Sequence, residues 1–261
     1  MHAHGKDVGA PTNWISPAEA KGREPAVRVG GGVLESPGTG IVNSHALLTF
    51  LHGAFEDLGG DVALASSVSS VVPLASGGMG YRISATGPPG SQGDSTEITA
   101  DVVVNAAGLG AIAISNMVLP QERHMKAYFC KGTYFSYSSS QPKVNTLLYP
   151  APVKGLAGLG THLTLDMAGR VRFGPDIEWI DDPGDYAPNE RSMVAAVAAI
   201  KEYLPGLDEA ALAPDYCGIR PKIVPEGGGG AGEVDFVIRE EHGFDGFINL
   251  LGIESPGMLP N

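Results

Sequence analysis

The sequence is poor in cysteine, in basic residues and in long apolar runs, and each shortage excludes a class of protein. Two cysteines in 261 residues, Cys130 and Cys217, give neither a disulfide framework nor the spacing of a metal site, and a reducing compartment is the simplest interpretation. The net charge of −12 argues against nucleic acid or an anionic membrane surface as a partner. It leaves room for a local basic pocket that binds a small anionic substrate.

Motifs of several other classes are also missing. No apolar run is long enough to span a bilayer, so we expect no transmembrane segment. The first residues have neither the apolar core of a signal peptide nor an arginine-rich presequence. Gly-x-Ser-x-Gly and Walker motifs are absent, which removes support for a hydrolase or an ATPase. The histidines show no ligand spacing such as His-Glu-x-x-His, and we assign no metal.

What is present indicates a globular, turn-rich protein. Hydrophobic residues make up 43% of the chain, enough for a core, and 37 glycines with 20 prolines favour many turns between strands. The length suits one large domain or two intertwined ones. The clearest helix is 45–58, whose apolar residues recur at intervals of three and four and which Gly59 and Gly60 end.

Other elements follow from local signals. Ser16 and Pro17 are typical of a helix start, and further helices are expected over 192–203 and 208–212. The expected strands are 61–64, 68–74, 81–85, 101–105, 128–137, 146–149, 163–165, 171–173, 218–222, 235–238 and 247–251.

Two parts of the chain differ in the pattern of their predicted strands. Val102–Val104 is a β-branched run typical of a strand buried on both faces of a parallel sheet, and with helix 45–58 and strand 61–64 it indicates part of a doubly wound α/β unit. From residue 120 to about 173, strands alternate with turns, as in an antiparallel or mixed sheet. The predicted fold class is α/β, with an inserted α+β domain.

Two glycine-containing turns follow predicted strands. Strand 247–251 runs into the turn Gly252–Gly257, and glycine lets a backbone approach a ligand closely. Strand 101–105 ends in Ala106-Ala107-Gly108, and ligands of open α/β sheets lie beyond the carboxyl ends of strands. The first turn is interpreted either as a cofactor contact or as an ordinary strand-to-helix turn. The second is interpreted either as a nucleotide contact or as tight helix packing.

Six polar side chains are candidates for substrate chemistry. Near pH 7 a histidine can take the proton of a hydroxyl while a hydride leaves the same carbon, which suits His162; the alternative is a structural histidine. The planar fork of Arg220 can bind a carboxylate, and the alternative is a surface salt bridge. Four further side chains could assist substrate binding: Lys222, Lys131, Tyr134 and Tyr149. The alternative is that the lysines are solvated and the tyrosines are half-buried packing residues.

Several ordered segments together resemble the D-amino-acid-oxidase-like FAD-dependent oxidoreductases, from about residue 10 to the last residue. The segments that carry the resemblance are 34–45, 102–109, 131–135, 148–152, 159–164, 218–222 and 249–257. The resemblance implies a discontinuous FAD domain with an inserted substrate domain. The implied division is 1–34 (substrate domain or linker), 35–119 (FAD domain), 120–217 (substrate domain) and 218–261 (FAD domain).

The resemblance also implies roles for single residues. Arg220 would hold a substrate carboxylate, and His162 would be the base over the substrate hydroxyl in the same pocket. The implied activity is oxidation of a small 2-hydroxy acid, with electrons passing to an unidentified acceptor, and relatives are often mitochondrial. The residues implied to contact FAD are Val68, Ala106, Ala107, Gly108, Gly252, Ile253, Glu254, Ser255, Pro256 and Gly257.

One departure from the family pattern shapes these expectations. The family opens with strand, Gly-x-Gly-x-x-Gly and helix, and this sequence contains no such turn. We therefore expect a fragment that lacks this motif and the helix after Gly257. The alternatives are another FAD-dependent 2-hydroxy-acid or amino-acid oxidase, and an inactive fragment that cannot hold FAD.

Overall fold

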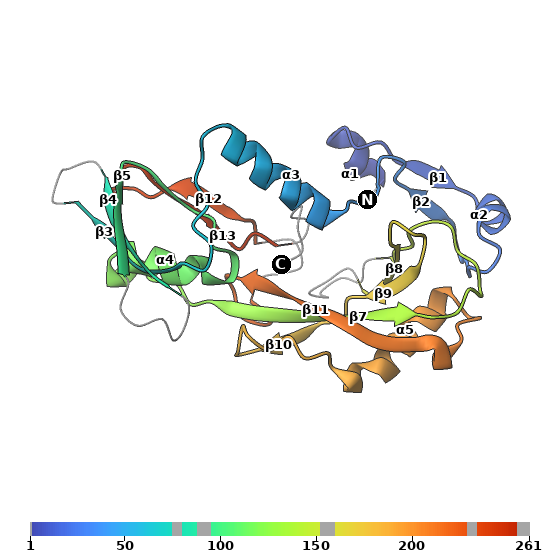
Figure 1. Cartoon of the computed structure of the whole chain (residues 1–261). Coiled ribbons are helices and arrows are strands. Elements are labelled where there is room, and N and C mark those ends of the chain that lie inside the picture. Colours follow the sequence, from blue (N-terminus) through green and yellow to red (C-terminus); the bar gives the residue numbers. More distant parts are fainter. Residues whose placement is uncertain (1, 75–79, 88–94, 152–159, 229–233, 255–261) are drawn as a thin grey trace. The chain divides into compact units, whose positions relative to one another are not determined.

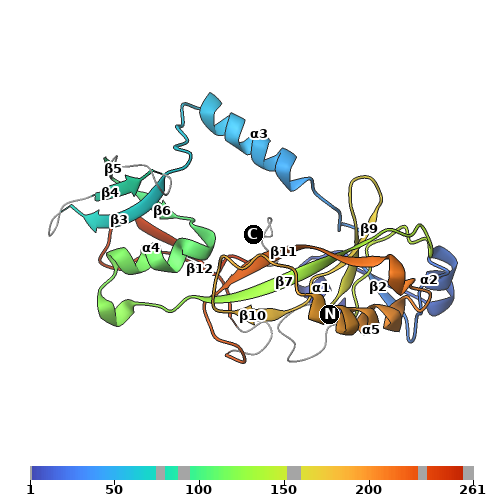
Figure 2. The same ribbon diagram turned by 60° about the horizontal axis from the view of Figure 1, so that its bottom comes forward.

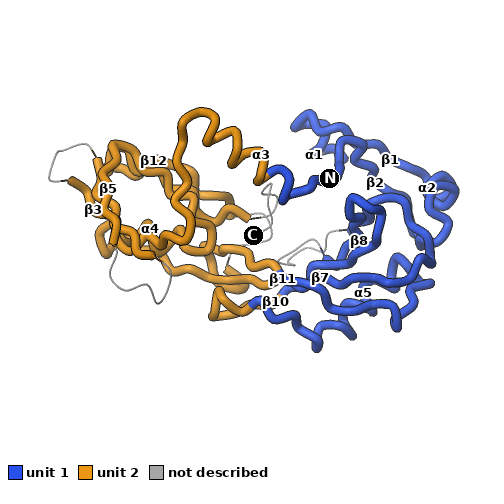
Figure 3. Tube along the Cα trace, viewed as in Figure 1, with its two compact units in different colours: residues 1–47, 132–177, 186–217 blue, residues 48–131, 178–185, 218–261 orange. Residues whose placement is uncertain are grey.

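The computed structural model describes residues 2–74, 80–87, 95–151, 160–228 and 234–254. The chain divides into two compact units (Figure 3). Unit 1 comprises residues 1–47, 132–177 and 186–217, and unit 2 comprises residues 48–131, 178–185 and 218–261. The four-segment domain division drawn from the sequence stays a prediction.

The described residues contain short helices and many strands (Figure 1). The α-helices are α1 (His2–Asp7), α2 (Pro17–Arg23), α3 (Ser44–Asp57), α4 (Ala111–Val118) and α5 (Met193–Tyr203). Single 3₁₀ turns are η1 (Gly108–Gly110), η2 (Gln121–Arg123), η3 (Glu190–Ser192) and η4 (Glu209–Ala211). The strands are β1 (Asn13–Ile15), β2 (Val33–Glu35), β3 (Ser67–Pro73), β4 (Tyr81–Thr86), β5 (Ser95–Ala100), β6 (Val103–Asn105), β7 (Tyr128–Tyr137), β8 (His162–Leu165), β9 (Val171–Gly174), β10 (Glu178–Ile180), β11 (Leu212–Lys222), β12 (Val237–Glu240) and β13 (Phe247–Leu251).

Unit 1 is built on an antiparallel sheet in which β9 lies between β7 and β8. β11 pairs with β7, and Figure 2 shows these two long strands side by side. Leu163, Phe173 and Phe135 form one cross-strand row, and all three are fully buried. They share a core with Ala196 and Ile200 of α5. Because side chains alternate across a strand, the residues on either side of this row point to the opposite face of the sheet.

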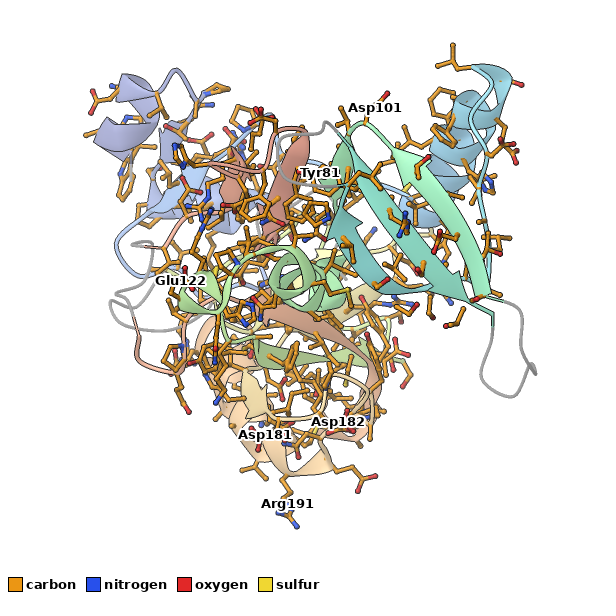
Figure 4. All side chains as sticks on the ribbon, turned by 90° about the vertical axis from the view of Figure 1, so that its left-hand side faces the viewer. Tyr81, Asp101, Glu122, Asp181, Asp182 and Arg191 are labelled. Atoms are coloured by element: carbon orange, nitrogen blue, oxygen red, sulfur yellow. The ribbon has the colours of Figure 1, made fainter. Side chains whose placement is uncertain are left out.

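Unit 2 contains two three-stranded sheets. β3, β4 and β5 form an antiparallel sheet, whereas β13 lies between antiparallel β12 and parallel β6. Figure 1 shows α4 beside β3 and β13, which it contacts. Val118 of α4 shares a core with Val71, Tyr81 and Phe247. Tyr81 of β4 is labelled in Figure 4, where it lies toward the sheet of β12, β13 and β6. Its hydroxyl donates to the Asp245 carbonyl at 3.0 Å.

Many predicted elements are confirmed. β7 and β13 have the predicted bounds, and the helix after Ser16 forms as α2, where the Ser16 hydroxyl accepts from the Glu19 amide at 3.3 Å. The predicted helix at 45–58 forms as α3, one residue earlier. Its apolar residues are not buried, however: Leu48 and Leu51 are each 50% exposed and Leu58 is 89% exposed.

Other predictions are wrong. No strand forms at 61–64, and the 208–212 helix is only the turn η4 before β11 begins at Leu212. The predicted strand at 146–149 is reduced to one bridge between Leu148 and Leu163. The strands β1, β2, β5 and β10 and the helices α1 and α4 were not predicted from the sequence.

The valine run is in a parallel pairing, as predicted, but it is not buried on both faces. Val102 is 56% exposed and Val104 is 55% exposed. β6 lies at the end of its three-stranded order and pairs with β13 only, among the strands of the described residues. α4 contacts it, and Val103 packs into the core that contains Val118. A β-branched run therefore indicated the parallel pairing without indicating how many layers cover it.

Candidate functional site

The carboxyl ends of β6 and β13 form the first candidate site, in unit 2. The two strands run parallel with Asn249 opposite Asn105, so the residues that follow them emerge at the same edge of the sheet. The residues that follow the two strands are Ala106–Gly108 and Gly252–Glu254, two of the predicted cofactor segments. Ligands of open α/β sheets bind at such an edge. The structure thus brings together residues that are more than 140 positions apart in the sequence.

Backbone conformation at this edge requires glycine. Gly108 has φ +54° and Gly252 has φ +67°, both in the left-handed region that side chains disfavour. A Cβ on Gly108 would meet no atom of the described residues within 4 Å, so among them the backbone there is open to an approaching group. A Cβ on Gly252 would lie 3.0 Å from Cγ2 of Ile223, so this glycine also permits close packing against the chain after β11.

The edge has features that fit a dinucleotide such as FAD. The open backbone at Gly108 leads directly through η1 into the N-terminus of α4, and helix N-termini favour phosphate groups. Of the other predicted cofactor residues, Val68 is 40% exposed on β3 in the other sheet of unit 2. Ser255, Pro256 and Gly257 lie outside the described residues.

Arg220 lies on β11 in the same unit, between buried Ile219 and buried Pro221. Its Nη1 is 4.0 Å from Sγ of Cys130 on β7. Burial raises the pKa of the Cys130 thiol, although the nearby Arg220 and Lys222 charges oppose this change. The thiol is therefore neutral near pH 7 and does not compensate the guanidinium charge, which suits a residue that binds an anion.

The two predicted lysines already have carboxylate partners. Nζ of Lys222 is 2.6 Å from Oε1 of Glu254, which ties the predicted cofactor turn to the end of β11. Lys131 is 3% exposed and lies 2.8 Å from Asp185 and 3.2 Å from Glu178. Burial disfavours its ammonium, but the bonds to Asp185 and Glu178 outweigh this effect and raise the pKa of Lys131. Their substrate-binding roles stay predictions, and Arg220 is the stronger candidate.

The second candidate site is a row of side chains on the sheet of unit 1. His162 on β8 lies opposite Gly174 on β9, and a Cβ on Gly174 would be 3.0 Å from Cα of Tyr134 on β7. On the other side, the ring of Tyr149 stacks on His162 with centroids 4.3 Å apart. This row is next to the buried Phe173 row, so it points away from the core. Three of the six polar candidates thus share one face of one sheet.

Hydrogen bonding sets the state of His162. Its Nδ1 is 3.2 Å from the Gly160 carbonyl oxygen, which can only accept, so this contact requires the proton on Nδ1. In the neutral ring Nε2 then carries the lone pair that a base needs. His162 is 8% exposed, and the Tyr149 ring, itself 49% exposed, accounts for part of that cover.

Two groups of residues were missed by sequence reasoning. The first is a buried polar network in unit 2, where the Asn249 amide donates to Ser115 and Glu241 and the Asn105 amide donates to Asn249. No local signal marks a glutamate that becomes buried. The second is Arg172 on β9, whose side chain lies over the Tyr216 ring. Its position between Val171 and Phe173 was a usable signal, since alternation places it opposite the core.

The described residues add two findings on site type. None of their helices has the length and apolarity needed to cross a bilayer. Within the same residues, no cluster of three or more His, Cys, Asp or Glu side chains is placed to hold a metal ion.

Comparison with known proteins identifies the family. The model of the FAD dependent oxidoreductase family, DAO, matches residues 1–260, and the chain belongs to this family. The predictions of the family and of FAD as its cofactor are confirmed.

Particular relatives agree with this assignment. The mitochondrial L-2-hydroxyglutarate dehydrogenase of Arabidopsis thaliana is 40% identical over 176 residues, which cover 62% of this chain and 35% of the relative. The L-2-hydroxyglutarate dehydrogenase of Salmonella houtenae is 31% identical over 169 residues, which cover 64% of this chain and 37% of the relative. The matched region is therefore a little over a third of these relatives' length.

Solved structures share the fold, which confirms the predicted fold class. The FAD-bound L-alpha-glycerophosphate oxidase of Mycoplasma pneumoniae superposes with a TM-score of 0.75 at 18% identity, over 94% of this chain and 60% of that chain. L-Proline dehydrogenase from P. horikoshii gives a TM-score of 0.69 at 16% identity, over 95% of this chain and 60% of that chain.

Proposed function

We propose that this chain supplies substrate-binding and part of the FAD-binding residues of an enzyme that oxidises L-2-hydroxyglutarate to 2-oxoglutarate. The relatives named L-2-hydroxyglutarate dehydrogenase support the substrate, as does the resemblance of the sequence to that enzyme. The observation that supports the chemical step is the state and position of His162. Its lone pair is on Nε2, and it lies in a polar row on the face of the unit 1 sheet opposite the core.

Oxidation removes a proton and a hydride from the alcohol. His162 Nε2 takes the proton of the C2 hydroxyl, and the C–H bond breaks as the C2–O bond becomes a carbonyl. FAD, when bound, supplies the acceptor for the hydride. The Nδ1 contact with the Gly160 carbonyl stabilises the imidazolium that forms, because both ring nitrogens of this cation are donors.

Arg220 has the role of binding a substrate carboxylate, since its charge is not neutralised by the Cys130 thiol. The open backbone at Gly108 and the turn from Gly252 to Glu254 hold part of FAD in this proposal. FAD held by these residues would supply the redox chemistry, and the proposal includes an electron acceptor that is still to be identified. A mitochondrial location is also part of the proposal, supported by the name of the plant relative.

The test starts with the cofactor. Purified chain is titrated with FAD while the visible absorption and flavin fluorescence are followed, and the complex is then mixed with L-2-hydroxyglutarate without oxygen. We expect a saturable flavin signal that bleaches with this substrate and not with its D enantiomer. If the protein never binds FAD, the result supports an inactive fragment. If an amino acid or another 2-hydroxy acid bleaches the flavin instead, the result supports another FAD-dependent 2-hydroxy-acid or amino-acid oxidase.

Substitution of His162 tests the chemical step. Loss of a general base lowers rates by roughly 10²–10⁴-fold, so the His162→Gln variant should bleach more slowly by about that factor while still binding FAD. His242→Gln, at an exposed histidine of unit 2, is the matched control. Unchanged bleaching in His162→Gln removes this residue from the mechanism.

A further inference from the structure

The polar face of the unit 1 sheet carries a second row beside His162. Thr164 on β8 pairs with Arg172 on β9, which in turn pairs with Ser136 on β7. This row and the His162 row lie on either side of the buried Phe173 row, so both point to the same face. Arg172 is therefore diagonal to His162 on adjacent strands, a position whose Cα separation is roughly 7–8 Å.

Aromatic rings hold the Arg172 side chain along this face. Its guanidinium carbon lies 5.4 Å from the centre of the Tyr216 ring, and Tyr216 stacks on Tyr134 with centroids 4.7 Å apart and planes 9° apart. The Tyr216 side chain also shares a hydrogen bond with Arg172, and the remaining donors of the guanidinium can bind a planar anion. The side chain is 33% exposed, so an anion in solution can reach it.

Among the described residues, Asp215 is the acidic group that pairs with Arg172. Nε of Arg172 is 3.6 Å from Oδ2 of Asp215, which is longer than a hydrogen bond between charged groups. Asp215 is therefore a nearby charge that leaves most of the five guanidinium donors without a partner in this contact. Thr164 and Ser136 are neutral, so among the partners paired with Arg172 in its row no other charge competes for an anion.

We propose that Arg172 binds the carboxylate of the substrate that is remote from the reacting carbon, and so selects dicarboxylic over monocarboxylic 2-hydroxy acids. This inference rests on the proposed function and adds its specificity. A dicarboxylate has a second planar anion, which the guanidinium fork binds with two parallel hydrogen bonds. A monocarboxylate leaves these donors without a ligand partner.

The test compares Arg172→Gln with Arg170→Gln in the full chain supplied with FAD. Arg170 is the matched control because its side chain is 74% exposed and it pairs only locally, with Asp166 in the turn between β8 and β9. Turnover is measured with L-2-hydroxyglutarate and with L-2-hydroxybutyrate. We expect Arg172→Gln to lower kcat/KM for the dicarboxylate by ~10–100-fold, mainly through KM, and by less than ~3-fold for the monocarboxylate.

Direct binding separates this inference from the proposed reaction. Calorimetric titration with 2-oxoglutarate and 2-oxobutyrate needs no turnover, and the preference for the diacid should be lost in Arg172→Gln alone. Failure of the wild type to oxidise any 2-hydroxy acid contradicts the proposed function, while a diacid preference that depends on Arg172 would still support this inference. A wild type without that preference, or an Arg172→Gln variant that keeps it, overturns the inference.

Asp215→Asn distinguishes binding from a structural role. Removing the carboxylate beside Arg172 should tighten 2-oxoglutarate binding by ~2–5-fold, because the guanidinium loses a competing anion. If Arg172 serves only to pair with Asp215, this variant leaves ligand binding unchanged, and that result also overturns the inference.

Discussion

Glu241 carries a charge into the core of unit 2, where its side chain is fully buried. Its carboxylate accepts from Asn249 at 2.9 Å and from Arg239 at 3.1 Å, and it pairs with Arg123. Burial alone would raise the pKa of Glu241, but these hydrogen bonds and charges outweigh it and lower the pKa. The ionised form is therefore part of the folded state.

Replacing this charge should be costly near neutral pH. Glu241→Gln leaves Arg123 and Asn249 with a poorer partner, and we expect a loss of about 2–4 kcal/mol in the free energy of unfolding at pH 7. Urea midpoints of the variant, of the wild type and of the exposed control Glu122→Gln (labelled in Figure 4) measure this loss. A Glu241→Gln midpoint equal to that of the control would contradict the structural role of the network.

The same substitution has a defined pH dependence. Because the folded-state pKa of Glu241 is lowered, its stabilisation is present above the unfolded value, about 4.3, and is lost as the pH falls through the folded value. The stability difference between wild type and Glu241→Gln should be constant above pH ~5.5 and should shrink in more acidic solution. A difference that grows on acidification would reverse the sign assigned here.

At the scale of the element, Gly174 is the residue that lets β9 pass between its neighbours. It has φ +131°, and a Cβ there would lie 2.9 Å from the Thr133 carbonyl oxygen and 3.0 Å from Cα of Tyr134. We expect Gly174→Ala to lower the free energy of unfolding by about 2–4 kcal/mol, because strain and a backbone clash add.

Gly169 supplies a comparison without the backbone clash. It also has positive φ, +76°, which is nearer the left-handed region than that of Gly174, and a Cβ there would meet no atom of the described residues within 4 Å. Gly169→Ala should therefore show the strain alone, about 1 kcal/mol. Denaturant unfolding of both variants measures the difference, and equal losses would show that the contact with β7 is easily relieved.

The elements also show how far sequence reasoning reaches. The bounds of β7 and β13 and the Ser16 cap follow from local composition, and the structure confirms them. The exposure of Val102 could not be predicted, because it depends on which strands and helices cover β6 and not on the β-branched run itself.

Contacts within the candidate site depend on register between distant strands. His162, Tyr149 and Tyr134 were selected one at a time, and nothing in the sequence indicates that they share a row. The stack of Tyr134 on Tyr216 joins residues 82 positions apart and requires the β7–β11 register. Site residues could thus be proposed from their type, while their neighbours could not.

At the scale of the whole molecule, the two units share two long strands. β7 and β11 each have residues in both units, so unfolding of one unit would interrupt strands of the other. We expect one cooperative transition. The chain has two tryptophans, Trp14 in unit 1 and Trp179 in unit 2, and each can report on its own unit.

Single-tryptophan variants make this measurement possible. Fluorescence of Trp179→Phe follows Trp14, and fluorescence of Trp14→Phe follows Trp179, during urea unfolding. Both midpoints, corrected for any effect of the substitutions on the circular-dichroism transition, should coincide within error. Two separated midpoints would show that the units unfold independently in spite of the shared strands.

One consequence follows from α3, whose 14 residues bury no side chain. Packing against a core normally supplies most of the stability of a helix in a protein, and a helix of this length is marginal in water without it. The caps of α3 therefore contribute a larger share of its stability than caps usually do. The Asn43 side chain accepts from the Ala46 amide at 3.1 Å, and Gly59 turns the chain at φ +87°. On warming, we therefore expect α3 to unwind before α4 and α5, which bury side chains in the cores.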